Sequence, residues 1–252
     1  MIVDAHVHLP VLESGSTLND KKTALLDEMR RNHVDRCIVI SDSELTSDIG
    51  SLDECAELFS STANVRVVGG ISPLIDFDAQ LTRLERYISE GKIVGVKVFP
   101  GHEGFYLSDR RLDRVYELAA ETDTPVLFHS GWDNSVYGSW EEAEKVITRY
   151  PGLKLVCCHC FYPDVASCGR LIQYPNMYFD LSSVADDEAI LARIEPEIGK
   201  LIEQIPDRVL FGSDYGCCSE SAHIRFVEAL QISENIRKAV LGENAVRLYR
   251  LK

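Results

Sequence analysis

Short runs of apolar, mostly β-branched residues recur along the whole chain, and segments with helical periodicity separate most of them. Runs of this length with β-branched enrichment are typical of strands, whereas apolar positions spaced three and four apart are typical of helices. Strands are expected at Ile2–His8, Arg36–Ser41, Val65–Ser72, Ile93–Phe99, Pro125–His129, Leu153–His159, Met177–Leu181 and Arg208–Asp214. Helices are expected at Asp20–Asn32, Leu52–Ser61, Asp78–Glu90, Asp109–Glu121, Glu141–Tyr150 and Ser219–Gln231.

Helix-capping residues support this pattern, because Asn19, Ser51, Ser108 and Ser139 stand where helices are expected to begin. Strands that alternate with helices imply right-handed crossovers and a parallel sheet. Eight such units predict an α/β fold in which residues 1–252 form a single-domain (β/α)₈ or TIM barrel. An open, doubly wound sheet is the alternative.

Charge and composition narrow the possible partners. The chain has 252 residues with 26 Lys and Arg against 40 Asp and Glu, a formal net charge of -14. This charge opposes phosphate backbones and anionic lipid surfaces, so neither nucleic acid nor a membrane is an expected partner. The sequence has neither a secretory leader pattern nor an apolar run long enough to span a bilayer, which predicts a cytoplasmic protein.

The eight cysteines are expected to be reduced thiols. Several are adjacent pairs in apolar surroundings, and the chain is not a short secreted domain of the kind that disulfides stabilise. The cluster Cys157-Cys158-His159-Cys160 lacks the Cys-x-x-Cys spacing of structural zinc sites, so a zinc knuckle is disfavoured.

The most informative motif lies near the N-terminus, in Asp4-Ala5-His6-Val7-His8. Because side chains alternate along a strand, His6 and His8 should point to the same face, and imidazole is the commonest protein metal ligand. Two hydrogen-bonded core histidines are the alternative. Asp4 should share that face, either as a hydrogen-bond partner beneath the metal site or as a structural residue.

Other polar residues follow apolar runs at the ends of the predicted strands. Lys97 lies near the end of the fourth strand, His129 ends the fifth, His159 the sixth and Asp214 the eighth. Barrel enzymes carry their chemistry at the carboxyl ends of the strands. The sequence therefore predicts one site at that end of the barrel.

These residues belong to motifs that resemble the amidohydrolase superfamily, in the compact branch that contains aminocarboxymuconate-semialdehyde decarboxylase. The motifs are Asp4-Ala5-His6-Val7-His8, Gly95-Val96-Lys97-Val98-Phe99-Pro100, Phe128-His129-Ser130-Gly131, His159, Phe211-Gly212-Ser213-Asp214 and residues 241–249. The resemblance implies that His6, His8, His129 and Asp214 hold a divalent metal, most often zinc. It also implies that Asp214 accepts and returns the proton of an activated water. His159 would either ligate a second metal or polarise the substrate and shuttle protons, and the second role is expected here.

Three further positions are expected to contact substrate. Lys97 is expected to place a positive charge near the substrate or in a polar network, to form a structural salt bridge, or to be carboxylated. A carboxylated Lys97 would bridge two metals, whereas one metal per chain is expected if the lysine is unmodified. His102, in the loop after the fourth strand, either lines the pocket or faces solvent. Trp132 belongs to an aromatic loop with Tyr137 and Trp140 around Asp133 and Asn134. His33 and His223 are expected at the surface.

The sequence thus predicts a metal-dependent hydrolase that attacks an amide, ester or lactone carbon of a small organic substrate. The first alternative is a non-oxidative decarboxylase or hydratase on the same scaffold, and the second is a non-catalytic metal-binding barrel. Oligomeric state is left open, with a homodimer as one option.

Overall fold

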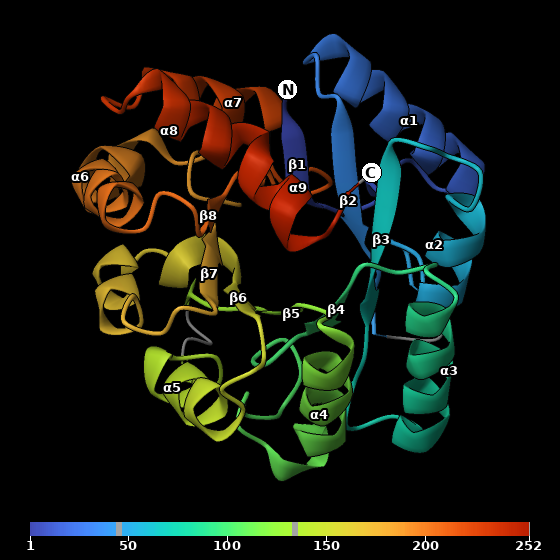
Figure 1. Cartoon of the computed structure of the whole chain (residues 1–252). Coiled ribbons are helices and arrows are strands. Elements are labelled where there is room, and N and C mark those ends of the chain that lie inside the picture. Colours follow the sequence, from blue (N-terminus) through green and yellow to red (C-terminus); the bar gives the residue numbers. More distant parts are fainter. Residues whose placement is uncertain (44–46, 133–135, 252) are drawn as a thin grey trace.

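Eight parallel strands form one sheet in the order β1 to β8, as Figure 1 shows. The computed structural model describes residues 1–43, 47–132 and 136–251. The strands are β1 (Val3–Val7), β2 (Arg36–Ile40), β3 (Val65–Gly70), β4 (Gly95–Val98), β5 (Val126–Phe128), β6 (Leu155–Cys157), β7 (Met177–Asp180) and β8 (Val209–Leu210). All the predicted strands are confirmed, although the observed strands are shorter.

The sheet closes on itself, because β8 returns to β1. The Ala5 amide donates to the Phe211 carbonyl at 3.0 Å, and the Asp214 amide donates to the His6 carbonyl at 2.8 Å. The prediction of a single-domain (β/α)₈ barrel is therefore confirmed, and the open-sheet alternative was wrong. Closure also explains why residues from opposite ends of the chain, such as His6 and Asp214, lie next to each other.

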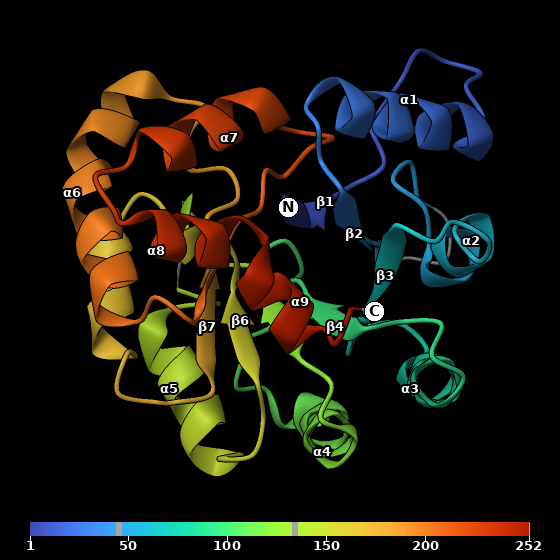
Figure 2. The same ribbon diagram turned by 45° about the horizontal axis from the view of Figure 1, so that its top comes forward.

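A ring of helices surrounds the strands (Figures 1 and 2). The α-helices are α1 (Leu18–Arg31), α2 (Leu52–Leu58), α3 (Phe77–Ser89), α4 (Asp113–Thr122), α5 (Trp140–Arg149), α6 (Glu188–Gln204), α7 (Glu220–Ala229), α8 (Glu234–Lys238) and α9 (Asn244–Leu248). Short turns of other helix types are η1 (Arg110–Leu112), η3 (Cys158–Phe161), η4 (Val165–Arg170) and η5 (Ala239–Glu243). The sequence analysis missed α6, whose interior contains Pro196.

Two of the four predicted helix caps are confirmed. The side chains of Ser51 and Ser139 accept backbone N–H groups at the starts of α2 and α5. Helix α1 instead begins after Thr17, which forms a capping box with Asp20, so the prediction of Asn19 was wrong. Asp109 caps η1, one residue after the predicted Ser108. A capping side chain must reach the amide two or three residues ahead, which selects one position in a polar run.

The barrel interior is apolar below the site. Val3, Ala5, Ile38, Val68 and Leu127 belong to one buried cluster, which Ala245, Leu248 and Tyr249 of the α9 region extend. Figures 1 and 2 show α9 lying across that end of the strands. The amino-terminal end of the barrel is thus covered, and chemistry is confined to the carboxyl ends. In the described residues, no helix is both long and apolar enough to cross a membrane.

Candidate metal centre and its pocket

His6 and His8 are aimed at the same point by the backbone of β1. The strand register shifts between Asp4 and Val7, and the His6 amide donates to the Asp4 carboxylate at 3.1 Å. Val3 and Ala5 pack inside the barrel, whereas Val7 packs in the outer core. The irregularity means that simple alternation did not hold. The prediction that Asp4 shares a face with His6 was therefore wrong.

Asp4 instead lies against α7. Its carboxylate also accepts the Ser213 amide at 3.0 Å, so it ties β1 to the segment that carries Asp214. Burial, followed by repulsion from buried Glu220, raises the pKa of Asp4 well above its usual range. Asp4 thus supports the backbones of His6 and Asp214 from behind the barrel wall.

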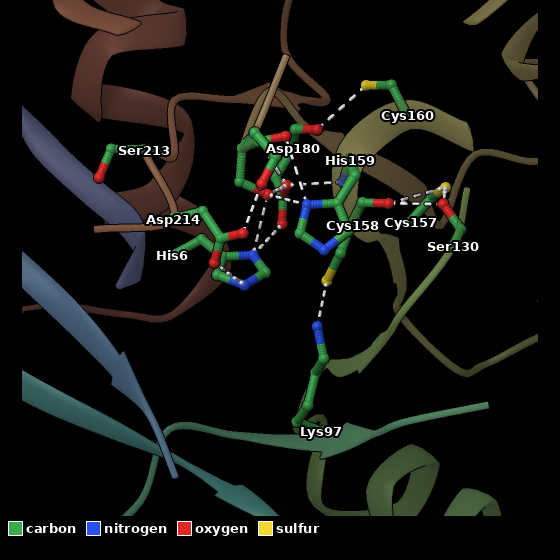
Figure 3. A network of polar contacts seen from close by, with 12 residues as sticks. His6, Lys97, Ser130, Cys157, Cys158, His159, Cys160, Asp180, Ser213 and Asp214 are labelled. Atoms are coloured by element: carbon green, nitrogen blue, oxygen red, sulfur yellow. Dashed lines mark hydrogen bonds and ion pairs between the residues drawn. The ribbon is translucent and has the colours of Figure 1, made fainter. Parts of the chain in front are cut away.

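Three side chains present electron pairs to one another at the carboxyl end of the barrel. The Nε2 atoms of His6 and His8 each lie 3.4 Å from Oδ1 of Asp214, and possible ligand atoms of the three residues lie within 4.8 Å of one another. Figure 3 shows His6 and Asp214 turned toward each other. The His6 Nε2 and Asp214 Oδ1 atoms are buried and have no hydrogen-bond partner.

The tautomers of both histidines follow from their other ring nitrogens. His6 Nδ1 lies 2.9 Å from Oδ2 of Asp180, and His8 Nδ1 lies 3.0 Å from the Ile40 carbonyl. Both Nδ1 atoms must donate, so each Nε2 of a neutral ring carries a lone pair. Burial lowers the pKa of His6, which keeps that ring neutral. Two lone pairs and a carboxylate oxygen therefore face one another, an arrangement that a bound cation stabilises.

Asp180, at the end of β7, is a site residue that the sequence analysis missed. Besides holding His6 (Figure 3), its carboxylate accepts the amides of His159 at 3.0 Å and of Ser182 at 3.1 Å. Burial alone would raise the pKa of Asp180, but attraction to His6 and hydrogen bonds from His6 and Ser182 lower it. The available signal was its position, since Asp180 follows an apolar run as His129 and His159 do.

His159 lies in the same network. Its Nδ1 is 2.8 Å from the Ser182 hydroxyl oxygen, and its ring centre is 5.0 Å from that of His6. Burial lowers the pKa of His159 to about 3, so its ring is uncharged. Its backbone is left-handed, with φ at 64°, a conformation that costs a non-glycine residue free energy and often marks a functional site. Asp214, with φ at 63°, shares this feature.

His129 lies beside the three convergent residues without joining them. Its ring centre is 5.0 Å from that of His159 and 4.0 Å from that of His102. The described residues form two closely spaced groups of possible ligands, and His129 belongs to neither the group of His6, His8 and Asp214 nor the other one. Burial, followed by repulsion from His159, lowers the pKa of His129, so its ring is neutral.

A cavity of about 550 Å³ opens over these residues. The predicted substrate residues Lys97, His102 and Trp132 all line it, as do His129 and His159. The Trp132 ring stacks on His129 at 5.6 Å between centres with an interplanar angle of 9°. The predicted neighbours Asp133 and Asn134 lie outside the described residues. The cavity is large enough for a small organic molecule.

Lys97 lies at the floor of this cavity. It is almost fully buried, and its Nζ donates to Sγ of Cys158 at 3.0 Å, as Figure 3 shows. Two acidic cavity residues, Asp42 and Glu103, were not predicted; the Ser43 hydroxyl donates to Glu103 at 2.5 Å. They lie in the loops after β2 and β4, where their sequence context is that of ordinary polar loop residues.

One histidine prediction was wrong and one was right. His33 is exposed, as predicted. His223 is buried, because the Ala185 amide donates to its Nε2 at 3.2 Å and its Nδ1 lies 2.8 Å from the Ser219 carbonyl. The sequence pattern did not indicate this role. In the folded protein, His223 forms hydrogen bonds with backbone groups that would otherwise be buried without a partner. All eight cysteines are free thiols, as predicted.

Comparison with known proteins adds a family and several structural neighbours. Residues 3–251 match the family model described as amidohydrolase. None of the curated proteins matches the chain.

Three solved structures illustrate the neighbourhood. An uncharacterized TIM-barrel protein from Bordetella bronchiseptica is 19% identical with a TM-score of 0.79, covering 99% of this chain and 98% of that one. A dihydroxybenzoic acid decarboxylase from Polaromonas sp. with bound manganese is 17% identical with a TM-score of 0.73, at 99% and 97% coverage. The 4-oxalomesaconate hydratase from Rhodopseudomonas palustris is 17% identical with a TM-score of 0.71, at 99% and 96% coverage.

These structural likenesses agree with the barrel described above. The family match spans nearly the whole chain and includes the strand ends that carry the histidines and Asp214. The chain therefore belongs to the amidohydrolase family, whose barrel it shares.

Proposed function

We propose that this protein is a metal-dependent hydrolase that attacks a carbonyl carbon of a small amide, ester or lactone. One observation carries the proposal: His6 Nε2, His8 Nε2 and Asp214 Oδ1 face one another with no proton between them. This donor set fits a divalent cation, with His129 as the predicted fourth ligand. Imidazole and carboxylate ligands suit zinc, and the structurally similar dihydroxybenzoic acid decarboxylase contains bound manganese. Both metals should therefore be tried in the activity assays.

When bound, such a cation acidifies water and polarises carbonyl oxygens. The chain's own residues would then manage the proton. Ser183 donates its hydroxyl to Oδ2 of Asp214, which leaves Oδ1 facing the centre. Burial alone would raise the pKa of Asp214, but attraction to His6 and His159 lowers it, so the group is a carboxylate that can accept a proton. His159 lines the cavity as an uncharged ring. Its Nδ1 donates to the Ser182 hydroxyl oxygen, whose own proton goes to Asp180, so its Nε2 can accept a proton.

A decarboxylase or hydratase is the second candidate. The named activities of two of the neighbours, a decarboxylase and a hydratase, favour it. So does the flat surface formed by Trp132 stacked on His129, which suits a planar unsaturated substrate. The same centre would then bind an acidic substrate, and His159 Nε2 would take the proton that Asp214 accepts and pass it to the carbon framework.

Parallel assays on the metal-loaded protein separate the candidates. Acid release from small lactones and N-acyl compounds reports hydrolysis, and carbon dioxide release from aromatic or muconate-like acids reports decarboxylation. We expect hydrolysis, its loss on chelation, and its recovery with zinc or manganese. In Asp214→Asn we expect metal to remain bound while turnover is lost, and Asp207→Asn, an exposed acid at the other end of the barrel, to behave as wild type. Full turnover in Asp214→Asn would contradict the proposed proton transfer.

A further inference from the structure

The carboxylate of Asp214 is held from behind by a serine in the loop after β7. Ser183 donates its hydroxyl to Oδ2 of Asp214. The other oxygen, Oδ1, is buried without a hydrogen-bond partner and lies 3.4 Å from Nε2 of His6 and of His8. This oxygen faces the lone pairs of two imidazole nitrogens, which repel it until a cation is bound. The hydrogen bond from Ser183 therefore opposes a rotation of the carboxylate away from the centre.

The backbone holds this pair of residues in place at a cost. The φ angle is 61° at Ser183 and 63° at Asp214, so both lie in the left-handed region. This conformation costs a non-glycine residue free energy and often marks a functional site. Both side chains are also buried. The loops after β7 and β8 thus fix the two groups against each other.

The thiol of Cys218 contacts the same serine. The Cys218 amide donates to the Asp214 carbonyl at 3.0 Å, and its Sγ lies 3.3 Å from Oγ of Ser183. Because the single hydroxyl proton of Ser183 goes to Asp214, the thiol must be the donor in this contact. Burial raises the pKa of Cys218 to about 12, so the thiol keeps its proton. A chain of hydrogen bonds therefore runs from Cys218 through Ser183 to Asp214.

From this chain of contacts, we infer that Cys218 is a positioning residue for the proposed metal ligand Asp214 and that it acts through Ser183. A donor aimed at a lone pair of the Ser183 oxygen orients that hydroxyl and strengthens the hydrogen bond it makes to Asp214. The inference rests on the proposed function, because it concerns the metal centre on which that function depends.

The neighbouring thiol provides a matched comparison. Cys217 and Cys218 both line the cavity, and neither belongs to a closely spaced group of possible metal ligands in the described residues. Cys217 is exposed, and its side chain forms no hydrogen bond with a described residue. The two positions therefore differ in the contact with Ser183, so a positioning effect should be found at Cys218 alone.

Binding of zinc and of manganese, measured by chelator competition, tests the inference without requiring turnover. Ser183→Ala should weaken the binding of both metals about 10- to 100-fold, the usual cost of removing a group that orients a metal ligand. Cys218→Ala should weaken both by about two- to fivefold, because a thiol is a weak donor. Cys218→Ser keeps a donor and should bind as the wild type does. Cys217→Ala, the control, should also leave both affinities unchanged.

A double-mutant cycle separates an effect through Ser183 from a direct one. In the Ser183→Ala background, Cys218→Ala should cause no further loss of affinity, because the link to Asp214 is already broken. The losses should also be equal for the two metals, whereas a thiolate that bound the metal itself would affect zinc far more than manganese. Urea unfolding of the metal-free variants reports folding. If Ser183→Ala is unstable, Ser183→Gly removes the hydroxyl and relieves the left-handed strain.

Three results would overturn the inference and leave the metal centre standing. The first is wild-type affinity in Cys218→Ala, which would follow if the thiol donated to nearby Asp186 instead. The second is full additivity in the cycle, and the third is a loss confined to zinc. Failure of the wild-type protein to bind either metal would overturn the proposed metal centre, and the inference with it.

Discussion

Replacing Asp180 with Asn should weaken metal binding although Asp180 is not itself one of the proposed ligands. Its carboxylate accepts hydrogen bonds from His6 Nδ1 and from the amides of His159 and Ser182. An Asn amide has only one acceptor atom, so one orientation places NH₂ against His6 Nδ1–H and the other places it against two backbone N–H groups. In the first case His6 shifts its proton to Nε2, which cannot then bind a metal.

The expected loss follows from these contacts. Removing such a partner of a ligating histidine typically costs about 10- to 100-fold in metal affinity. Leaving buried donors unpaired should also lower the free energy of unfolding of the metal-free protein by about 1–3 kcal/mol. Metal affinity would be measured by chelator competition and stability by urea unfolding. Glu142→Gln is the matched control, a buried carboxylate bonded to Ser108 and Lys145 far from the site. Wild-type metal affinity in Asp180→Asn would refute the reasoning.

Three further predictions concern pH, burial and metal count. Burial is the main cause that raises the pKa of Glu220, and it also raises the pKa of Asp4, which faces it. The folded protein therefore holds protons at pH values where the unfolded chain has released them. The free energy of unfolding should fall as pH rises above about 4. Glu220→Gln should therefore gain stability relative to wild type as pH increases, by about 1.4 kcal/mol per unit of pKa elevation, in denaturant titrations at several pH values; a constant difference would contradict this. His223→Ala should lower the free energy of unfolding by about 2–4 kcal/mol, because it leaves two buried backbone groups without a hydrogen-bond partner. His33→Asn, at an exposed position, should change it little. Equal effects of the two substitutions in thermal melts would contradict the structural role of His223. Elemental analysis should find one metal per chain whether or not bicarbonate is present, since Lys97 already donates to Cys158; two metals with bicarbonate would indicate a carboxylated lysine.

The barrel was predictable because its signals are periodic and independent of distant contacts. Apolar runs mark every strand, and their polar ends place His6, His129, His159 and Asp214 at one end of the sheet. Helix α6 was missed because its apolar positions alternate with acidic ones around Pro196, which normally ends a helix. The predicted ends of the helices were less accurate than the predicted helices themselves, because the first residue depends on which polar side chain reaches a free backbone amide.

The site was only partly predictable, because supporting residues act through contacts that sequence does not encode locally. Asp180 forms hydrogen bonds with His6, which lies 174 positions away, and no motif links them. Asp4 was assigned to the wrong face because the register shift in β1 breaks strand alternation. His223 looked like a surface residue because its partners, Ala185 and Ser219, become neighbours only after folding.

The most direct test of the central claim is anomalous diffraction from crystals of the metal-loaded protein. The predicted result is a single strong peak between His6 Nε2, His8 Nε2 and Asp214 Oδ1. A metal bound elsewhere, for example among His6, Cys158 and Asp180, the other closely spaced group of possible ligands in the described chain, would contradict the claim. So would crystals that take up no metal at all.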